Sequence, residues 1–280
     1  MALTLAATPL GNPGDASPRL KDAIAAAEII AAEDSRRFHR LCSDIGVTFT
    51  GRVISFFEGN ETERSQEILQ YLHEGKNVLV VSDAGMPTIS DPGFRLARDA
   101  MAQNLEVKVI PGPSAPVMAV ALSGLATDRF SFEGFTPRAL GARQAAFEAL
   151  RFEERTMVFF EAPHRLVESL QDASAIFGSD RRGAICREMT KTYEETIRGS
   201  LAELLTWAQS KEVLGEITLV IAGAEAGTAE KSADQMVTRV REFEAAGMDR
   251  KSAISTVADE FDLPKRIVYA AVVDANKMSK

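Results

Sequence analysis

The chain has 280 residues, 45% hydrophobic and 26% charged, which fits one large globular domain or two to three small ones. Its formal net charge of −8 argues against a wholly basic nucleic-acid binder but leaves room for a local basic face. Cys42 and Cys186 stand apart, without CxxC or metal-ligand spacing, which is typical of a protein of the reducing cytoplasm. The N-terminus lacks the basic region of a signal peptide, and the longest apolar window, APVMAVALSGLA, is too short to cross a bilayer, so no membrane association is predicted.

Apolar runs along the chain predict strands. They are continuous rather than alternating, which is the pattern of strands buried on both faces. They occupy residues 3–8, 27–34, 77–83, 107–112, 156–163, 183–189 and 216–223. Helical periodicity lies between them, at 17–27, 63–75, 93–103 and 164–178, and the last two patterns close near the plausible caps Asn104 and Gly178. This alternation predicts an α/β fold with largely parallel pairing.

Two changes of composition suggest how the chain is divided. The long polar connection 125–154 carries a helical pattern of its own and marks a boundary between two α/β domains, predicted at 1–122 and 123–228. The small polar residues of 223–234 have the composition of a linker. Short helical patterns follow, which predict a small helical, helix-turn-helix-like module at 233–280.

Unusual loops follow the first four predicted strands: TPLGNPGD (8–15), EDSRR (33–37), VSDAGMPTISDPG (81–93) and PGPSAPV (111–117). In open parallel sheets, ligands bind outside the carboxyl ends of the strands, so these loops can converge on one crevice. The first, second and fourth loops each have a structural alternative, as a turn, a capped helix start and a tight corner. The third is much longer than a connection requires. The absence of GxGxxG and of a P-loop lysine argues against a Rossmann dinucleotide site or an NTPase.

The motifs ATPLGNPGD, AAEDSRR, VSDAGMPTISDPG, IPGPSA, DRFSFEGF, EAPHRL and REMTK occur in this order. With them the chain resembles the ribosomal RNA small subunit methyltransferase I family, which has the tetrapyrrole methylase fold, most strongly over residues 1–225. The resemblance implies two α/β domains with a cofactor cleft between them, S-adenosylmethionine as cofactor, and a homodimer. It further implies 2′-O-methylation of a cytidine ribose in the decoding region of 16S rRNA in the small ribosomal subunit. Family members often carry SYHEHNE where this chain reads SFFEGNE, so Phe57 and Gly59 replace two histidines.

The resemblance also implies which residues bind the cofactor. They are Leu10, Asp83, Ala84, Gly85, Met86, Ser90, Ser114, Ala115, Glu161 and Met189. The segment from Asp83 to Met86 would cradle the amino-acid and ribose parts, with backbone groups that can approach only where side chains are small or turned away. Met86 offers a soft apolar contact near the sulfonium. No cluster of metal-ligand side chains occurs at these loops, so no metal is expected.

A ribose hydroxyl is a poor nucleophile until its proton leaves, so a nearby proton acceptor is expected. The candidates for catalytic roles are Glu33 and Asp34 after the second predicted strand, and Glu188 with Lys191 in REMTK. A charged Lys191 cannot act as a base, but it can steer a phosphate. Which of these groups accepts the proton is left open at this point.

Arginines around the predicted crevice are candidates for contacts with RNA phosphates, which would position the RNA and make its binding salt-dependent. They are Arg36, Arg37, Arg40, Arg138, Arg143 and Arg165. For any one of them, the alternative is an ordinary solvated surface charge. The helical module could also face RNA, or it could serve packing or a dimer contact.

Other functions are compatible with parts of the sequence. A methyltransferase of the same fold acting on a tetrapyrrole or another small molecule would share the cofactor loops, but the motif EGFTPRALGAR and the helical module argue against it. A non-enzymatic DNA-binding regulator would use DRKSAISTVADEFDLPKRIVYAAVVD as a helix-turn-helix. That reading leaves the seven loop motifs without a purpose and lacks a strongly basic recognition helix.

Overall fold

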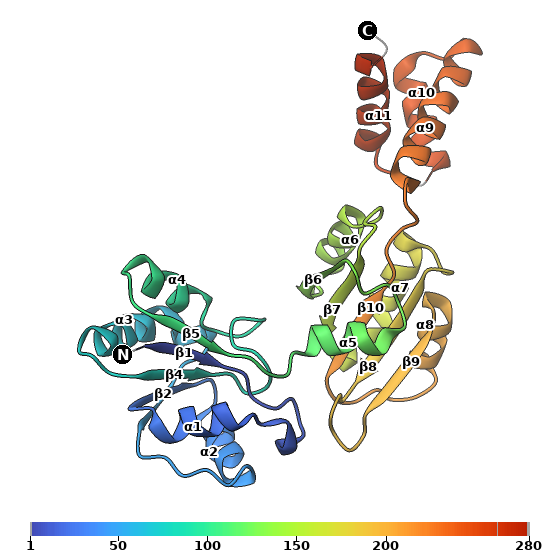
Figure 1. Ribbon diagram of the computed structural model, residues 1–280. Helices are drawn as coiled ribbons and strands as arrows, with labels where there is room; N and C mark the ends of the chain where they lie inside the picture. The colour runs from blue at the N-terminus through green and yellow to red at the C-terminus, as the bar shows by residue number, and fades with distance from the viewer. Residues whose placement is uncertain (1, 262, 279–280) are drawn as a thin grey trace. The chain divides into compact units, whose positions relative to one another are not determined.

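The computed structural model describes residues 2–261 and 263–278 (Figure 1). Residues 1, 262, 279 and 280, which fall in the predicted N-terminal domain and helical module, lie outside the described residues. The chain forms two compact units, one made of residues up to Glu148 together with Arg155–Ala222, the other of Ala149–Glu154 together with the chain from Gly223 onward. Among the described residues, no helix has the length and apolar character needed to cross a membrane.

A wholly parallel sheet is formed by the first strands of the larger unit. They are β1 (Leu3–Ala6), β2 (Ile29–Ala32), β3 (Arg52–Ser55), β4 (Val78–Val81) and β5 (Val107–Ile110), in the order β3-β2-β4-β1-β5. Parallel pairing places the carboxyl ends of all these strands at one edge of the sheet. The loops after β1, β2, β4 and β5 therefore leave from the same edge, as the sequence predicts.

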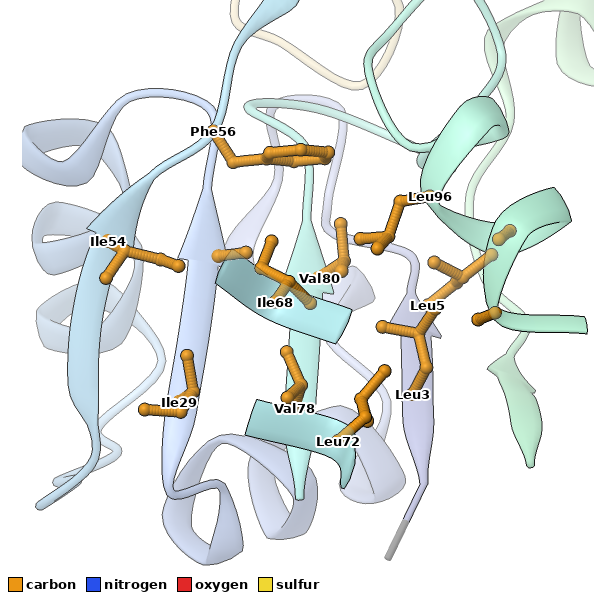
Figure 2. Packing of buried hydrophobic residues seen from close by; sticks show 13 residues of the cluster. Leu3, Leu5, Ile29, Ile54, Phe56, Ile68, Leu72, Val78, Val80 and Leu96 are labelled. Carbon is orange, nitrogen blue, oxygen red and sulfur yellow. The ribbon is translucent and has the colours of Figure 1, made fainter. Parts of the chain in front are cut away.

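Helices cover both faces of this sheet (Figure 1). Successive strand residues point to opposite faces. One set packs against α1 (Pro18–Ala26) and α2 (Ser35–Asp44), and the other against α3 (Glu61–His73) and α4 (Phe94–Ala102). Figure 2 shows the second set, in which Ile68, Leu72 and Leu96 from the helices lie against Val78 and Val80 of β4. The two-sided burial fixes the sheet, and with it the edge that carries the loops.

The second sheet has the order β6-β7-β10-β8-β9 and is mainly antiparallel. Its strands are β6 (Phe130–Phe135), β7 (Thr156–Glu161), β8 (Arg182–Arg187), β9 (Glu195–Ser200) and β10 (Ile217–Ile221). Only β6 and β7 pair in parallel; the other ladders are antiparallel. The prediction of largely parallel pairing thus holds for the first sheet and is wrong for the second.

Helix α5 (Ala115–Ser123) packs on one face of the second sheet, where Ala119 and Val120 contact Val158, Ala184 and Val220. The remaining helices of this part are α6 (Leu140–Ala149), α7 (Leu166–Phe177) and α8 (Leu201–Gln209), and a 3-10 turn at Pro163–Arg165 precedes α7. Two other 3-10 turns, Pro13–Asp15 and Glu58–Asn60, belong to the part of the chain that forms the first sheet. All of helix α5 except Ser123 precedes the predicted boundary between residues 122 and 123, although its partners belong to the second sheet. The division at that boundary stays a prediction.

The helical region at the C-terminus forms α9 (Thr228–Ala245), α10 (Arg250–Glu260) and α11 (Lys265–Met278). Buried Val240, Val257 and Val268, one from each helix, pack in a common core. Asp249 caps α10 by accepting the backbone N–H groups of Lys251 and Ser252. Three helices are therefore present where the sequence predicts short helical patterns, but the first begins at Thr228, inside the segment 223–234 that was predicted to be a linker.

Candidate active site

One pocket of about 360 Å³ opens at the carboxyl edge of the parallel sheet. All ten residues predicted to bind the cofactor line it: Leu10, Asp83, Ala84, Gly85, Met86, Ser90, Ser114, Ala115, Glu161 and Met189. Glu33 and Arg37 line it too, as do Phe135, Phe160 and Ile217 from the second sheet. The volume is within the range of small-molecule and cofactor sites. The structure thus gathers the predicted residues around one space; their binding role remains a prediction.

The loop after β4 is fastened to its neighbours by backbone hydrogen bonds. Thr8 N–H donates to Gly85 O at 2.9 Å and Gly85 N–H donates to Thr8 O at 3.1 Å, so the loops after β1 and β4 pair. The Ser82 hydroxyl also donates to Gly85 O, at 3.1 Å. At the far end of the loop, Gly93 N–H donates to the buried Glu61 carboxylate at 3.0 Å. These bonds hold a dozen irregular residues in a defined shape.

Left-handed backbone accompanies this loop. Gly85 has φ 80°, and a Cβ built on it would lie 3.0 Å from Leu10 Cδ2. Thr88 and Ser90, which carry side chains, have φ 76° and 64°. Non-glycine residues in this region cost free energy and concentrate at functional sites, where the surroundings enforce them. The loop therefore presents bare backbone at Gly85 and aims the residues that follow Ser90.

Carboxylates give the pocket a negative wall. Burial raises the pKa of Glu33 and the pKa of Asp83 above their ordinary values. Burial, followed by the charges of Glu33 and Asp83, raises the pKa of Asp91 to about 7. Asp83 N–H donates to Glu33 Oε2 at 3.1 Å, and Asp34 N–H donates to Asp83 Oδ1 at 3.0 Å, so the loops after β2 and β4 interlock. A cation in this pocket would relieve the repulsion among these groups.

Asp34 does not line the pocket. Its Oδ1 accepts the backbone N–H of Arg36 at 2.8 Å as the N-cap of α2, and its Oδ2 pairs with the Arg36 guanidinium at 2.9 Å. The side-chain hydrogen bond from Arg36, supported by the backbone bond, lowers the pKa of Asp34 to about 2. A carboxylate so strongly stabilised in its charged form is a poor proton acceptor at neutral pH. In this structure Asp34 caps α2, and a catalytic role for it stays a prediction.

Glu188 and Lys191 form an ion pair outside the pocket. Lys191 Nζ lies 3.0 Å from Glu188 Oε1 and 3.0 Å from Glu216 Oε2. Burial acts to lower the pKa of Lys191, but hydrogen bonds to Glu216 and Glu188 outweigh it, so the pKa is raised. Burial acts to raise the pKa of Glu188, but hydrogen bonds from Glu216 N–H and Lys191 leave it lowered. Neither group is tuned to take a proton, and Lys191 lies against Gly11 of the loop after β1.

Two of the predicted RNA-binding arginines are committed to ion pairs inside the protein. Arg143 is 2% exposed and its Nε donates to Asp172 at 2.6 Å, so the prediction that it contacts RNA is wrong. Arg165 is 13% exposed; it pairs with Glu161 at 2.7 Å and donates to the Thr136 carbonyl at 3.1 Å. A guanidinium held in this way anchors its neighbours rather than a phosphate.

The remaining arginines are exposed. Arg37 lies at the pocket and its Nη1 is 3.2 Å from Asp83 Oδ2. Arg36 has 91% of its side chain exposed, Arg40 has 85%, and Arg138 is exposed as well. These three are available for a phosphate.

Sequence reasoning missed the most perturbed acid of the pocket, Asp91. Asp91 is the second aspartate of the loop VSDAGMPTISDPG, which the sequence marks as unusual. Nothing in the sequence shows that Asp91 is close enough to Glu33 for the two charges to interact. Phe57, at the position of a family histidine, is 45% exposed and does not line the pocket. Within the described residues, no group of three or more histidine, cysteine, aspartate or glutamate side chains is arranged to hold a metal ion.

Comparison with known proteins first identifies the class of methyltransferase fold to which the chain belongs. The family model Tetrapyrrole (Corrin/Porphyrin) Methylases matches residues 2–205. A solved structure of uroporphyrin-III C-methyl transferase from Thermus thermophilus, complexed with S-adenyl homocysteine, has a TM-score of 0.57 at 14% identity and covers 79% of this chain and 97% of its own. At this identity the likeness shows the fold alone.

Closer relatives narrow the class. The chain is 48% identical to ribosomal RNA small subunit methyltransferase I of Mycobacterium bovis, over 98% of this chain and 95% of that protein. It is 40% identical to the protein of the same name from Synechocystis, over 95% of each. The chain belongs to the ribosomal RNA small subunit methyltransferase I family, within the tetrapyrrole methylases. The resemblance and the fold class predicted from the motifs are confirmed.

Proposed function

We propose that this protein transfers a methyl group from S-adenosylmethionine to the ribose 2′-oxygen of a cytidine in the decoding region of 16S rRNA. Its similarity to relatives that are named for small-subunit rRNA methylation supports the substrate. The observation that carries the proposal is the pocket at the carboxyl edge of the parallel sheet, which combines bare backbone at Gly85 with a carboxylate wall. The choice of ribose oxygen and of cytidine rests on the family resemblance.

The pocket fits S-adenosylmethionine, a molecule with a sulfonium and an ammonium cation. Glu33, Asp83 and Asp91 supply negative charge, and cations favour the ionised form of such acids. Gly85, with φ 80° and Leu10 close behind it, leaves no room for a side chain of its own, so its backbone can face the ligand. The solved structure with S-adenyl homocysteine bound shows that this fold holds the demethylated form of the same cofactor in another protein.

S-adenosylmethionine supplies a methyl group that is already activated. The protein therefore has to position the acceptor oxygen of the ribose, keep water away from it and accept its proton. Phe135, Phe160 and Ile217 add apolar side chains to the lining of the pocket. Holding the acceptor oxygen in line with the methyl carbon can contribute several kcal/mol, on the order of 7 or more in favourable cases. The exposed Arg36, Arg40 and Arg138 would hold flanking RNA phosphates.

The experiment that tests this function separates binding from transfer. Calorimetry with S-adenosylmethionine in a buffer that contains a chelator measures binding without metal; failure of folded protein to bind would remove the cofactor assignment. Transfer of labelled methyl is then measured to small ribosomal subunits from a strain that lacks the modification, and to a corrin precursor as the alternative acceptor. Methylation of the subunits alone is expected, whereas methylation of the corrin would favour the small-molecule alternative.

The resemblance also supports a homodimer that works in the cytoplasm beside the small ribosomal subunit. Light scattering at micromolar concentration is expected to give twice the mass of 30.3 kDa for one chain. A mass of one chain under these conditions would overturn the dimer.

A further inference from the structure

Asp91 is a half-buried carboxylate in the pocket wall, directly after the left-handed Ser90. Asp83 has Arg37 as an ionic partner at 3.2 Å. By contrast, across the residues that the structure describes, no lysine or arginine forms an ion pair with Asp91. An unneutralised acid at the end of a strained loop costs stability, and such acids concentrate where a protein does chemistry.

The groups that face Asp91 come from three directions. Glu33 follows β2, Asp83 follows β4, and Glu216 precedes β10; all three carry like charge toward it. Burial is the largest effect, and together these influences raise the pKa of Asp91 to about 7. The acid is therefore poised between its two forms at neutral pH.

Glu33 is less suited to receive a proton from a substrate. One of its oxygens, Oε2, already accepts the backbone N–H of Asp83 at 3.1 Å. Among the backbone N–H groups of the described residues, none donates to the Asp91 carboxylate, and Asp91 is one of the residues that line the pocket.

We propose that Asp91 accepts the proton of the ribose 2′-hydroxyl during methyl transfer; this role rests on the function proposed above. As the 2′-oxygen forms its bond to the methyl carbon, the carbon–sulfur bond breaks and its electron pair goes to sulfur. The 2′-proton passes to the Asp91 carboxylate. A carboxylate and a sulfonium cation before the step become a carboxylic acid and a neutral sulfide after it, so the net charge of the site does not change.

This charge balance couples the protonation state of Asp91 to the methylation state of the cofactor. A cation in the pocket favours the carboxylate form, so binding the sulfonium prepares Asp91 as a base. The neutral sulfide exerts no such effect, so with the demethylated cofactor bound Asp91 keeps a larger protonated fraction than with the sulfonium bound. The coupling is visible as a proton released on binding, before any methyl transfer.

Proton release is measured by calorimetry of S-adenosylmethionine binding at pH 7 in two buffers of different ionisation enthalpy. A group with a pKa of about 7 is half protonated at pH 7, so wild type is expected to release up to about half a proton per site. S-adenosylhomocysteine, which has no sulfonium, is expected to release less. Asp91→Asn should bind both ligands with no difference in proton release between them, while Asp99→Asn, the same change on α4 outside the pocket, should behave as wild type.

Single-turnover methylation at saturating RNA and cofactor gives the second readout. Loss of a general base typically slows a reaction by about 100-fold or more, and that is the loss expected for Asp91→Asn. If Asp91→Asn keeps the wild-type difference in proton release, or methylates within about 3-fold of the wild-type rate, the proposal fails. Both of these results can be obtained only with a variant that binds S-adenosylmethionine, so they would overturn the role of Asp91 and leave the proposed function intact. If the wild-type protein did not bind S-adenosylmethionine, the proposed function itself would fail.

Discussion

Asp91 should make the folded protein less stable as the pH rises from about 4 to 7. Below pH 4 its carboxyl is protonated in both the folded and the unfolded chain, so it contributes nothing. Between pH 4 and 7 the unfolded chain releases a proton that the folded protein retains, because the pKa is raised from 3.8 to about 7 on folding. The free energy of unfolding therefore falls through this range and stays at its reduced value above pH 7.

The structure sets the size of this effect. Each pKa unit corresponds to about 1.36 kcal/mol, so the change from 3.8 to about 7 gives an upper bound of about 4 kcal/mol. Asp91 is only half-buried, and screening by water reduces the expected loss to about 2 kcal/mol. Asp91→Asn cannot ionise, so its advantage in unfolding free energy over wild type should grow by at least about 1 kcal/mol between pH 5 and pH 8.

Urea unfolding followed by tryptophan fluorescence measures this difference. The single tryptophan, Trp207 of α8, belongs to the same compact unit as Asp91. Comparing the two proteins at each pH cancels the groups that they share, and Asp99→Asn controls for removing any aspartate. An advantage of Asp91→Asn that is equal at pH 5 and pH 8 would show that the pKa of Asp91 is not raised and would refute the reasoning about the pocket.

Other substitutions test other parts of the structure. Gly85→Val should weaken S-adenosylmethionine binding by about tenfold or more in calorimetry, because a side chain at φ 80° is strained by about 1–2 kcal/mol and fills the space that the ligand needs. An unchanged affinity would show that this loop does not contact the cofactor. Arg143→Met should lower the free energy of unfolding by about 3–5 kcal/mol, since it leaves Asp172 buried without its partner; a normal melting temperature would contradict the buried pair. Arg36→Ala combined with Arg40→Ala should reduce RNA affinity and its salt dependence but not cofactor affinity; an unaltered salt slope would exclude these arginines from the RNA contact.

The place of the pocket could be predicted from the sequence because local composition marks the strands and the loops that follow them, whereas the individual cofactor residues were predicted from the family resemblance. The buried parallel strands β2 and β4 are continuous apolar runs, and the loop that follows β4 contains more Gly, Pro, Ser and Asp than a turn requires. The edge strands β3, β6 and β9 were not predicted, because partial exposure leaves them without a continuous apolar pattern. Strand β5 was predicted, but as buried on both faces, whereas its middle residues are exposed at the sheet edge.

Side-chain roles that depend on distant partners could not be predicted. Asp34 and Glu33 are adjacent, yet one caps α2 and the other enters the pocket, which is decided by how the chain leaves β2. Arg143 reads as a surface residue of a polar helix until α7 brings Asp172 against it. The pKa of Asp91 depends first on its burial and then on the charge of Glu33, which comes from another strand end. In each case the deciding contact is tertiary.

Ribose methylation of 16S rRNA is the central claim, and mapping it at nucleotide resolution tests the claim most directly. Small ribosomal subunits from a strain that lacks this protein are incubated with the purified chain and S-adenosylmethionine, and 2′-O-methylation is mapped along the rRNA before and after. The account predicts one new 2′-O-methyl group, on a cytidine of the decoding region, that requires both the protein and the cofactor. A methyl group that appears on a base, or no new modification of the rRNA by a chain that binds the cofactor, would contradict it.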